Sequence, residues 1–396
     1  MSPPAGRSAD IAIVGGGIVG TATATFLARA GARVTLYERS AIAAGASGRN
    51  SGVVQHPHDP VLAALYEASL AAYRELDEAS GGTLSLDAEP AGLLHVGRDL
   101  AVVAAIADAW RVRYPATRPE VLGGEELHRL EPALAEDLVA CRLRIGYPVA
   151  PAAATLAFAA EAERAGARFV IGREARVVVR AGSAVGVEVG GAVQPAAALV
   201  IAAGPWTPAL VDPTAAWQPI RPIWGVVAQV DLADAPRHVL EEADIDIEPD
   251  HDGGDAPAAG ADDGVEFSLV SAGGATSLGS TFLAREPRAA EFVDRLRARG
   301  ARYVPRLAGA PLVSVRSCAR PVSRDGRPLV GAVPWLDRAF VAAGHGPWGI
   351  STGPATARMI ADLILGKEGL IPAAFALRGS VGAPEERRSA PALRVE

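Results

Sequence analysis

Lysine is almost missing from this chain of 396 residues, because Lys367 is the only one and arginine supplies nearly all of the 38 basic side chains. Acidic side chains outnumber basic ones, 45 to 38, so the formal net charge is −7. Proteins that bind nucleic acid present basic stripes that neutralise phosphates. The charge balance therefore argues against nucleic acid as a partner.

Cysteines and long apolar runs are also scarce. The two cysteines, Cys141 and Cys318, lie far apart in the sequence and imply no disulfide framework. No apolar stretch approaches the ~20 residues of a membrane span, and the N-terminal segment MSPPAGRSAD has no apolar core of a secretory signal. We therefore expect a soluble, cytoplasmic protein without a transmembrane segment, long enough for two domains.

A glycine motif follows the first apolar run of the chain. Residues 11–14 predict a buried strand, and a G-x-G-x-x-G motif comes directly after it at Gly15, Gly17 and Gly20. Gly15 would permit a sharp turn, Gly17 would let the backbone approach a pyrophosphate, and Gly20 would let the following helix lie close to the strand. The N-terminus of that helix would present free N–H groups to the phosphates.

A second strand completes this unit. The helix is predicted to stop at Gly31, residues 34–37 predict the second strand, and Glu38 stands at its end. A carboxylate in that place can accept hydrogen bonds from the hydroxyls of an adenosine ribose. Together these elements predict a dinucleotide site, with contacts from Gly15, Gly17, Ile18, Val19, Gly20, Glu38 and Arg39.

Residues 177–202 predict a further part of the same domain. Residues 177–189 contain apolar runs separated by glycine turns, which is typical of a small antiparallel meander. Residues 199–202 predict a buried strand that ends at Gly204.

The C-terminal part of the chain repeats the pattern of strand, glycine-rich turn and helix. The pattern lies in RAFVAAGHGPWGISTGPATARMIADLILG. We expect Ser351 or Thr352 to cap the helix, Pro354 to lie in its first turn and Gly366 to end it.

The segments between these pieces predict a second, sheet-rich domain. Residues 220–232 and 265–283 predict strands, as does AGLLHVGRD, while residues 100–113 and 291–302 have helical spacing. Residues 248–264 are acidic and rich in Gly, Ala and Pro, which is typical of an exposed, mobile loop.

The predicted fold class is therefore mixed α/β (α+β): a discontinuous Rossmann-like nucleotide-binding domain with an inserted antiparallel-sheet substrate domain. We expect the nucleotide-binding domain to comprise residues 1–82, 149–214 and 318–379. The substrate domain would comprise residues 83–148 and 215–317, and residues 380–396 would form a flexible tail.

Several stretches of the chain resemble a known family. They are GGGIVG with Glu38, GASGRNSG at residues 45–52, VIAAGPWTP at residues 200–208, and CARPVSRDGRPLVG followed by AAGHGPWGISTGPATARMIADLI. In this order they resemble the FAD-dependent D-amino-acid oxidase superfamily, and within it glycine oxidase, sarcosine oxidase and the D-amino-acid dehydrogenases. The resemblance implies that the cofactor is FAD rather than NAD, and that the nucleotide-binding domain is an FAD-binding domain.

The resemblance also implies which residues contact the cofactor. GASGRNSG would run beside the isoalloxazine ring, and the helix after GHGPWG would aim its N-terminus at the ring edge where negative charge collects on reduction. The contacts implied beyond the first motif are Ala46, Ser47, Arg49, Asn50, Ser51, Gly52, Val177, Ala203, Gly204, Trp206, Arg320, Gly346, Pro347, Trp348, Gly349, Ile350 and Ser351.

For the substrate, the implied anchor is Arg320. In the family the arginine of this RP pair holds the substrate carboxylate, and a guanidinium can make two parallel charge-assisted hydrogen bonds. Relatives often carry another arginine in the stretch GHGPWG, where this chain has Pro347 and Trp348. That departure favours a bulkier or more apolar substrate, such as a secondary amine. Further candidates for the catalytic site and the substrate pocket are His345, Trp348, Trp224, Tyr303 and His56.

These roles predict an FAD-dependent enzyme that oxidises the C–N bond of an amino acid or secondary amine carrying a carboxylate. Hydride would pass to flavin N5 and the imine would hydrolyse. Oxygen or another electron acceptor would take the electrons, and a homo-oligomer is compatible with the sequence. Two alternatives stay open. One is a 2-hydroxy-acid dehydrogenase, which would need a base such as His56 or His345; the other is a flavin-binding subunit of a larger electron-transfer complex.

Three other residues or pairs bear on the chemistry. His56 and His58 form an H-x-H pair with no cysteine or carboxylate cluster beside it, so we expect no metal. The spacing of Cys318 to Asp325 is similar to that of the cysteine that carries covalent flavin in monomeric sarcosine oxidase. Sarcosine oxidases also place a lysine beside the flavin to favour electron transfer to oxygen, whereas Lys367 lies beyond the C-terminal helix.

Overall fold

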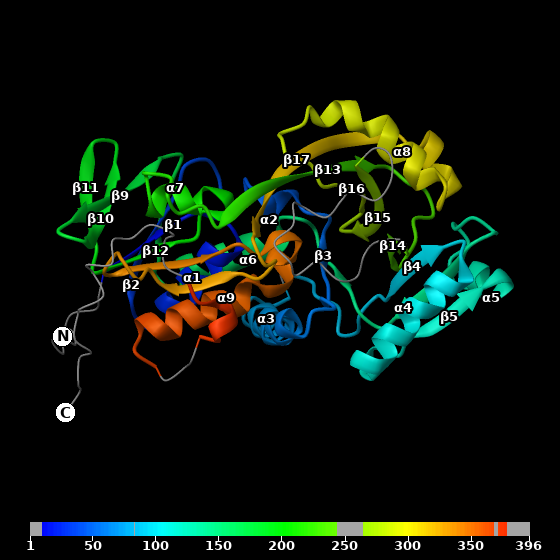
Figure 1. Ribbon diagram of the computed structural model, residues 1–396, viewed down its shortest axis with the longest axis horizontal. Coiled ribbons are helices and arrows are strands. Elements are labelled where there is room, and N and C mark those ends of the chain that lie inside the picture. Colours follow the sequence, from blue (N-terminus) through cyan, green and yellow to red (C-terminus); the bar gives the residue numbers. More distant parts are fainter. Residues whose placement is uncertain (1–9, 83, 244–263, 368–370, 378–396) are drawn as a thin grey trace.

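The computed structural model describes residues 10–82, 84–243, 264–367 and 371–377, and its two main sheets lie side by side along the longest axis of the molecule (Figure 1). The tail predicted at residues 380–396 lies outside the described residues, and so does the loop predicted at residues 248–264 except for Gly264.

The first sheet, on the left of Figure 1, has six strands. They are β1 (Asp10–Val14), β2 (Arg33–Glu38), β8 (Arg168–Ile171), β12 (Ala198–Ile201), β18 (Leu329–Ala332) and β19 (Ala339–Ala343). Their order is β18-β19-β12-β1-β2-β8, and every pair except β18 with β19 is parallel. The carboxyl ends of the parallel strands therefore meet at one edge, which is where open α/β sheets bind ligands.

A group of helices accompanies this sheet. They are α1 (Ile18–Arg29), α3 (Pro60–Ala79), α6 (Ala153–Arg164) and α9 (Gly349–Ile364). Helix α1 contacts α6 and α9, and α3 contacts α9. Although α1 is buried over residues 18–28, its hydroxyls have acceptors, because Thr21, Thr23 and Thr25 each donate to the carbonyl one turn back. A helix with polar side chains can therefore lie in this core.

The C-terminal helix begins earlier than the sequence predicts. A 3-10 turn, η5 (Gly346–Trp348), leads directly into α9, so Ser351 and Thr352 lie inside the helix and the predicted cap is wrong. The turn starts the helix through a backbone hydrogen bond from Trp348 to His345. This start uses no side-chain cap.

Pro354 consequently lies in the second turn of α9 rather than in its first. Because proline has no N–H, the carbonyl of Ile350 receives no hydrogen bond from the helix. The hydroxyl of Tyr73 on α3 donates to that carbonyl instead, with an O···O distance of 2.7 Å. Tyr73 is fully buried, so this bond joins α3 to α9 inside the core.

The second sheet, on the right of Figure 1, has eight strands. They are β4 (Leu93–Gly97), β5 (Glu120–Gly123), β6 (Val139–Leu143), β13 (Ile220–Val230), β14 (Val239–Glu242), β15 (Val265–Ala272), β16 (Ala275–Thr281) and β17 (Leu312–Ser323). Their order is β17-β13-β16-β15-β14-β4-β6-β5, and every pair except β14 with β4 is antiparallel. The accompanying helices are α4 (Leu100–Arg113), α5 (Gly124–Leu130) and α8 (Val293–Ala301).

Most predicted elements of this sheet-rich part are found. The helix at residues 100–113 is confirmed, and the Asp99 carboxylate caps it by accepting from the N–H of Ala101. Residues 265–281 form the hairpin of β15 and β16, two residues shorter than predicted, and it turns at two glycines with positive φ. The helix predicted at residues 291–302 is preceded by a 3-10 turn, η3 (Ala289–Phe292), and becomes α-helical only at α8.

Two small sheets and several short helices complete the described structure. The predicted meander is confirmed as β9 (Ala175–Arg180), β10 (Ser183–Val189) and β11 (Ala192–Pro195), and β3 (Val53–Val54) pairs with β7 (Tyr147–Pro148). The short helices are α2 (Ala46–Arg49), α7 (Thr207–Val211), η1 (Pro115–Thr117), η2 (Gly204–Trp206), η4 (Pro305–Gly309) and η6 (Ala373–Phe375).

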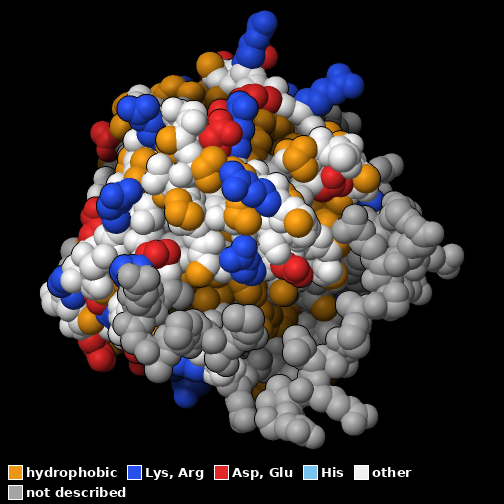
Figure 2. All heavy atoms as spheres, turned by 90° about the vertical axis from the view of Figure 1, so that its left-hand side faces the viewer, with side chains coloured by type: hydrophobic (Ala, Val, Ile, Leu, Met, Phe, Trp, Pro, Cys, Tyr) orange, Lys and Arg blue, Asp and Glu red, His pale blue; other side chains and the backbone are white. Residues whose placement is uncertain are grey.

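Basic and acidic side chains are interspersed on the face that lies at the left of Figure 1 (Figure 2). The predicted mixed α/β class is confirmed.

Candidate active site

A cavity of about 1,410 Å³ lies between the carboxyl-end edge of the first sheet and the second sheet. Val14, Glu38 and Ala343 line it from the first sheet, and Trp224 and Arg320 line it from the second. Pockets for single small ligands measure about 300–1,000 Å³. This cavity therefore has room for a large cofactor together with a small substrate.

The glycine motif forms the tight turn between β1 and α1. Gly15 has a φ of +116°, and a Cβ added there would lie 2.4 Å from the carbonyl oxygen of Ala202. A Cβ at Gly20 would lie 1.9 Å from the carbonyl oxygen of Gly15. Gly17 lines the cavity, and a Cβ there would come within 3.0 Å of the Ser47 hydroxyl. The turn therefore requires glycine at these positions. Because no side chain covers the start of α1, a pyrophosphate can approach its backbone closely.

Glu38 closes the same turn from the end of β2. One carboxylate oxygen accepts the N–H of Gly16 at 2.8 Å and the other accepts the N–H of Ser40 at 2.8 Å. Beside it, the guanidinium of Arg39 lies 4.0 Å from the ring centroid of Trp206. These three side chains line one part of the cavity.

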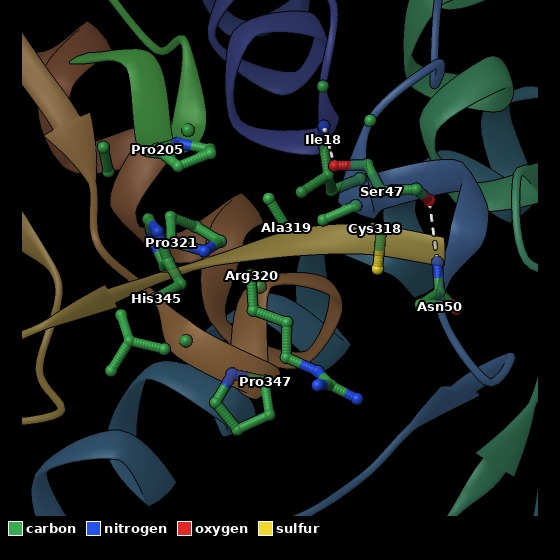
Figure 3. A pocket seen from close by; sticks show the side chains of 18 of the residues that line it. Ile18, Ser47, Asn50, Pro205, Cys318, Ala319, Arg320, Pro321, His345 and Pro347 are labelled. Carbon is green, nitrogen blue, oxygen red and sulfur yellow. Dashed lines mark hydrogen bonds between the residues drawn. The ribbon is translucent and has the colours of Figure 1, made fainter. Parts of the chain in front are cut away.

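The segment at residues 46–52 ties α1 to the second sheet. The Ser47 hydroxyl accepts the N–H of Ile18 at 3.0 Å, and the Asn50 side chain donates to the carbonyl of Ser47 at 2.8 Å (Figure 3). Arg49 donates to the carbonyl of Ser317 on β17 at 3.1 Å. The segment is thus fixed at both ends where it borders the cavity.

The start of α9 forms another wall of the cavity. His345 is buried, and its Nε2 lies 2.8 Å from the Thr356 hydroxyl. Since that hydroxyl donates to the carbonyl of Gly353, the imidazole donates to it through Nε2. Burial lowers the pKa of His345 to about 4, so the ring is neutral near pH 7. Its hydrogen bond to Thr356 holds the turn before α9 against the helix.

Arg320 projects from β17 into the cavity that Pro347 also lines (Figure 3). Its guanidinium donates to the carbonyl of Thr281 at 2.7 Å and to the hydroxyl of Ser280, and it lies 4.3 Å from the ring centroid of Phe282. Burial lowers the pKa of this guanidinium. Within the described residues it forms no ion pair, so its hydrogen-bond acceptors are all neutral.

Two carboxylates in the cavity were not found by sequence reasoning. Glu241 on β14 accepts from the Gln55 side chain at 3.0 Å, and burial raises its pKa to about 7. Burial also raises the pKa of Glu266 on β15 to about 7, and the Glu242 charge adds to this shift. The only signal in the sequence is that each glutamate interrupts an apolar strand.

All but three of the predicted site residues line this cavity, and the exceptions are Gly20, Tyr303 and His56. Gly20 lies behind the turn that it supports. Tyr303 lies behind Phe267, because the two rings stack at 4.5 Å between centroids, and its hydroxyl donates to Glu242. The structure thus brings Trp224, Trp348 and Arg320 to the cavity but leaves Tyr303 outside it.

His56 lies in an aromatic cluster outside the cavity. Its ring centroid is 4.9 Å from that of Tyr66, 5.6 Å from that of Trp110 and 4.6 Å from that of Tyr114. Burial lowers the pKa of this histidine. His58 does line the cavity, so the two histidines of the H-x-H pair face different surroundings.

Three further expectations concern metals, lysine and cysteine. Among the described residues, no group of three or more His, Cys, Asp or Glu side chains is placed to hold a metal ion. Lys367 pairs with Asp362 at 3.1 Å, away from the cavity lining. Cys318 lines the cavity from β17, and burial raises the pKa of its thiol. No helix in the described ranges is long and apolar enough to span a bilayer.

Comparison with known proteins gives a consistent result over most of the chain. The family model for FAD dependent oxidoreductases (DAO) matches residues 10–363. Glycine oxidase of Pseudomonas aeruginosa is 29% identical over 385 residues, which cover 94% of this chain and 99% of that protein. D-amino acid dehydrogenase of Methylobacterium nodulans is 28% identical over 435 aligned positions, which cover 90% of this chain and 95% of that protein.

A relative with a solved structure agrees in fold as well. Glycine oxidase of Geobacillus kaustophilus is 30% identical over 376 residues, which cover 91% of this chain and 93% of that protein. Superposed on its crystal structure, this chain gives a TM-score of 0.77, with 95% of this chain and 100% of that chain covered and 26% of the residues identical.

Proposed function

The chain belongs to the family of FAD dependent oxidoreductases (DAO) and is an FAD-dependent amino acid or amine oxidoreductase, and on that premise we propose that it oxidises the C–N bond of a substrate carrying a carboxylate. The substrate would be an amino acid or a secondary amine. The product of the oxidation is an imine, which water hydrolyses to a carbonyl compound and an amine. The carboxylate and the amine together define the substrate class.

FAD fits the residues of the cavity. The side-chain-free start of α1 at Gly17 would take the pyrophosphate, and Glu38 would accept the ribose hydroxyls. The segment at residues 46–52 and the start of α9 would border the flavin ring. When bound, FAD accepts a hydride from the substrate carbon that carries the nitrogen.

The single observation that carries the proposal is the environment of Arg320. This guanidinium is enclosed by protein and bonded only to neutral oxygens within the described residues, so no carboxylate is bonded to it and Glu266 acts on it only through its charge. A substrate carboxylate can supply a bonded anion and accept two parallel hydrogen bonds from the planar group. Arg320 would thereby fix the position of the carbon that is oxidised.

Acid–base chemistry by histidine is poorly supported. His345 is neutral near pH 7 and uses its Nε2–H for Thr356, and His56 lies outside the cavity. Oxidation of a 2-hydroxy acid would need a base for the hydroxyl proton, whereas a neutral amine needs only orientation. These placements remove His56 and His345 as the base that a hydroxy acid would need.

The turn before α9 bears on the size of the substrate. Pro347 and Trp348 line the cavity where glycine-oxidase-like members often carry a second arginine. Since these two residues add apolar surface in place of a second guanidinium, the site favours a substrate larger than glycine. We propose a substituted amino acid or a secondary amine in this place.

Bleaching of the bound flavin without oxygen tests the proposal. Purified protein would be mixed anaerobically with amino acids of both hands, N-methyl amino acids and the amines that lack only their carboxylate. Bleaching by at least one carboxylated amine, and not by its decarboxylated counterpart, is the expected result. Equal bleaching by both would overturn the role of the carboxylate, and bleaching by 2-hydroxy acids alone would favour the alternative reaction.

A further inference from the structure

The carboxylates of Glu266 and Glu241 line the cavity on the two strands that follow β16, the strand to which the Arg320 guanidinium is bonded. Arg320 donates to the carbonyl of Thr281, the last residue of β16, and β15 and β14 are the next two strands of the sheet. Neighbouring strands are about 4.8 Å apart. Glu266 on β15 and Glu241 on β14 are therefore about 5 and about 10 Å from β16, on the line that crosses the strands.

The Glu266 carboxylate forms no hydrogen bond or ion pair with the residues that the structure describes. Glu242 shows what a satisfied carboxylate in this sheet looks like, because Arg299 donates to both of its oxygens at 2.8 and 2.7 Å and Tyr303 adds a hydroxyl. Glu266 lines the cavity and feels the charges of Glu242, Arg320, Glu241 and Arg299 without a direct bond to any of them.

Glu241 and Gln55 offer further acceptors in the same place. The Gln55 amide nitrogen donates to Glu241, and both residues line the cavity. Gln55 is only 6% exposed, and its amide oxygen has no hydrogen-bond partner in the described structure. A buried polar atom without a partner costs about 1–3 kcal/mol, so a ligand that donates to it would be favoured.

Near Arg320 the cavity is thus lined by Glu266 and by the Gln55 amide oxygen, which have no donor among the described residues, and by Glu241, whose one donor is the Gln55 amide. We propose that Glu266, Glu241 and Gln55 form a subsite for a positively charged group on the far end of the substrate. This inference rests on the proposed function, because Arg320 must hold the carboxylate at the near end. The substrate class is then a basic amino acid, with a second ammonium or guanidinium group on its side chain.

The spacing of the strands sets the length of that substrate. With the substrate carboxylate held by Arg320 beside the end of β16, the strands that carry Glu266 and Glu241 are one and two strand spacings away, about 5 and about 10 Å. The α-nitrogen of an amino acid is only two bonds from the carboxylate carbon, so it cannot reach Glu241 while the carboxylate stays on Arg320. A side chain of three or four methylene groups with a terminal cation spans the gap.

Burial of the Glu241 and Glu266 carboxylates is consistent with a site that binds a cation. Burial raises the pKa of both Glu241 and Glu266 to about 7, so near neutral pH each carries only part of its charge. A cation bound beside them would favour their charged forms. Binding of a cationic group should therefore strengthen as the pH rises through about 7.

Two small carboxylate ligands test this subsite independently of the carboxylate anchor at Arg320. Pentanoate and 5-aminopentanoate differ only by a terminal ammonium, and neither has an α-amino group. Their dissociation constants for the FAD-loaded enzyme would be measured by titration calorimetry at pH 8, with absence of flavin bleaching checked in parallel. We expect 5-aminopentanoate to bind tighter on the order of ten-fold.

Variants test whether the tighter binding of 5-aminopentanoate depends on the proposed residues. In Glu266→Gln and in Glu241→Gln the preference for 5-aminopentanoate should shrink to about two-fold or less. The matched control is Glu286→Gln, which removes the same charge from an exposed side chain at the same cavity and should keep the preference. The comparison of the two ligands on the wild-type enzyme tests the subsite even if a variant does not fold.

The outcomes separate this inference from the proposed function. If both ligands bind wild-type enzyme equally, or if the preference survives in both Gln variants, the cationic subsite is wrong while the carboxylate anchor stands. If neither carboxylate binds, the anchor at Arg320 fails and the subsite fails with it. Turnover gives a second readout, since lysine or ornithine of the accepted hand should exceed norleucine and norvaline in kcat/KM.

Discussion

The guanidinium of Arg320 lies flat against the backbone of Gly225, so that a Cβ added at residue 225 would fall 2.5 Å from three of the guanidinium atoms. The two residues are on paired strands, since Gly225 of β13 is opposite Cys318 and Arg320 follows two residues later on β17. Gly225 thereby provides the space through which the Arg320 side chain reaches Thr281 and Ser280.

Gly225→Ala should displace Arg320 and weaken binding of carboxylate ligands as much as Arg320→Ala does. Since the added methyl group acts only through the arginine, the double variant should bind no more weakly than either single variant. Dissociation constants for pentanoate in the four proteins test this. Gly309→Ala is the control, because a Cβ there meets no atom within 4 Å. Additive losses in the double variant would contradict the relationship.

Gly17→Leu should abolish retention of FAD. A Cβ at this residue is already 3.0 Å from the Ser47 hydroxyl, and a longer side chain would occupy the approach of the pyrophosphate to α1. The measurement is the flavin-to-protein absorbance ratio after purification and after reconstitution with added FAD. A variant that keeps the wild-type ratio would show that the pyrophosphate binds elsewhere.

Tyr73→Phe should destabilise the protein by about 1–3 kcal/mol, because it leaves a buried carbonyl without a donor. That carbonyl belongs to Ile350, which loses its helical donor to Pro354 and receives the Tyr73 hydroxyl at 2.7 Å. The fall should appear in urea unfolding and shrink when Pro354→Ala restores a backbone N–H. Unchanged stability of Tyr73→Phe would mean that the bond contributes nothing.

Glu266→Gln should raise the melting temperature at pH 8 but hardly at pH 5. Burial, with Glu242 next, raises the pKa of Glu266 from 4.5 to about 7, so the folded protein keeps a proton that the unfolded chain has lost between these values. Stability contributed by this residue therefore falls as the pH rises from about 4.5 to about 7. Calorimetric scans against wild type and Glu286→Gln check the sign, and a gain at both pH values alike would refute it.

The sequence predicts best what depends on local pattern. The βαβ unit is found because Gly15 and Gly31 both adopt positive φ at the turns where the motif places them. The helix at residues 100–113 is found from its helical spacing, a local pattern that can be recognised without tertiary contacts. The division into two discontinuous domains stays a prediction.

What the sequence could not give depends on contacts between distant segments. The start of α9 differs from the prediction because a 3-10 turn replaces a side-chain cap. Tyr303 is aromatic like the lining residue Trp224, and only its stacking on Phe267 places it outside the cavity. Glu266 and Gln55 are distant in the sequence, and they line one cavity because Gln55 bonds to Glu241 on β14, the strand next to β15.

The most direct test of the account is the comparison of Arg320→Ala and Arg320→Lys with wild type for a carboxylated amine that bleaches the flavin. Losing a desolvated, bidentate charge pair costs about 2–5 kcal/mol, which is roughly 30-fold to several thousand-fold in affinity. We expect Arg320→Ala to lose that much affinity while it retains FAD, and Arg320→Lys to recover only part of it, because an ammonium keeps the charge without the planar fork. Unchanged affinity of Arg320→Ala for the same substrate would contradict the account and point to a substrate without a carboxylate.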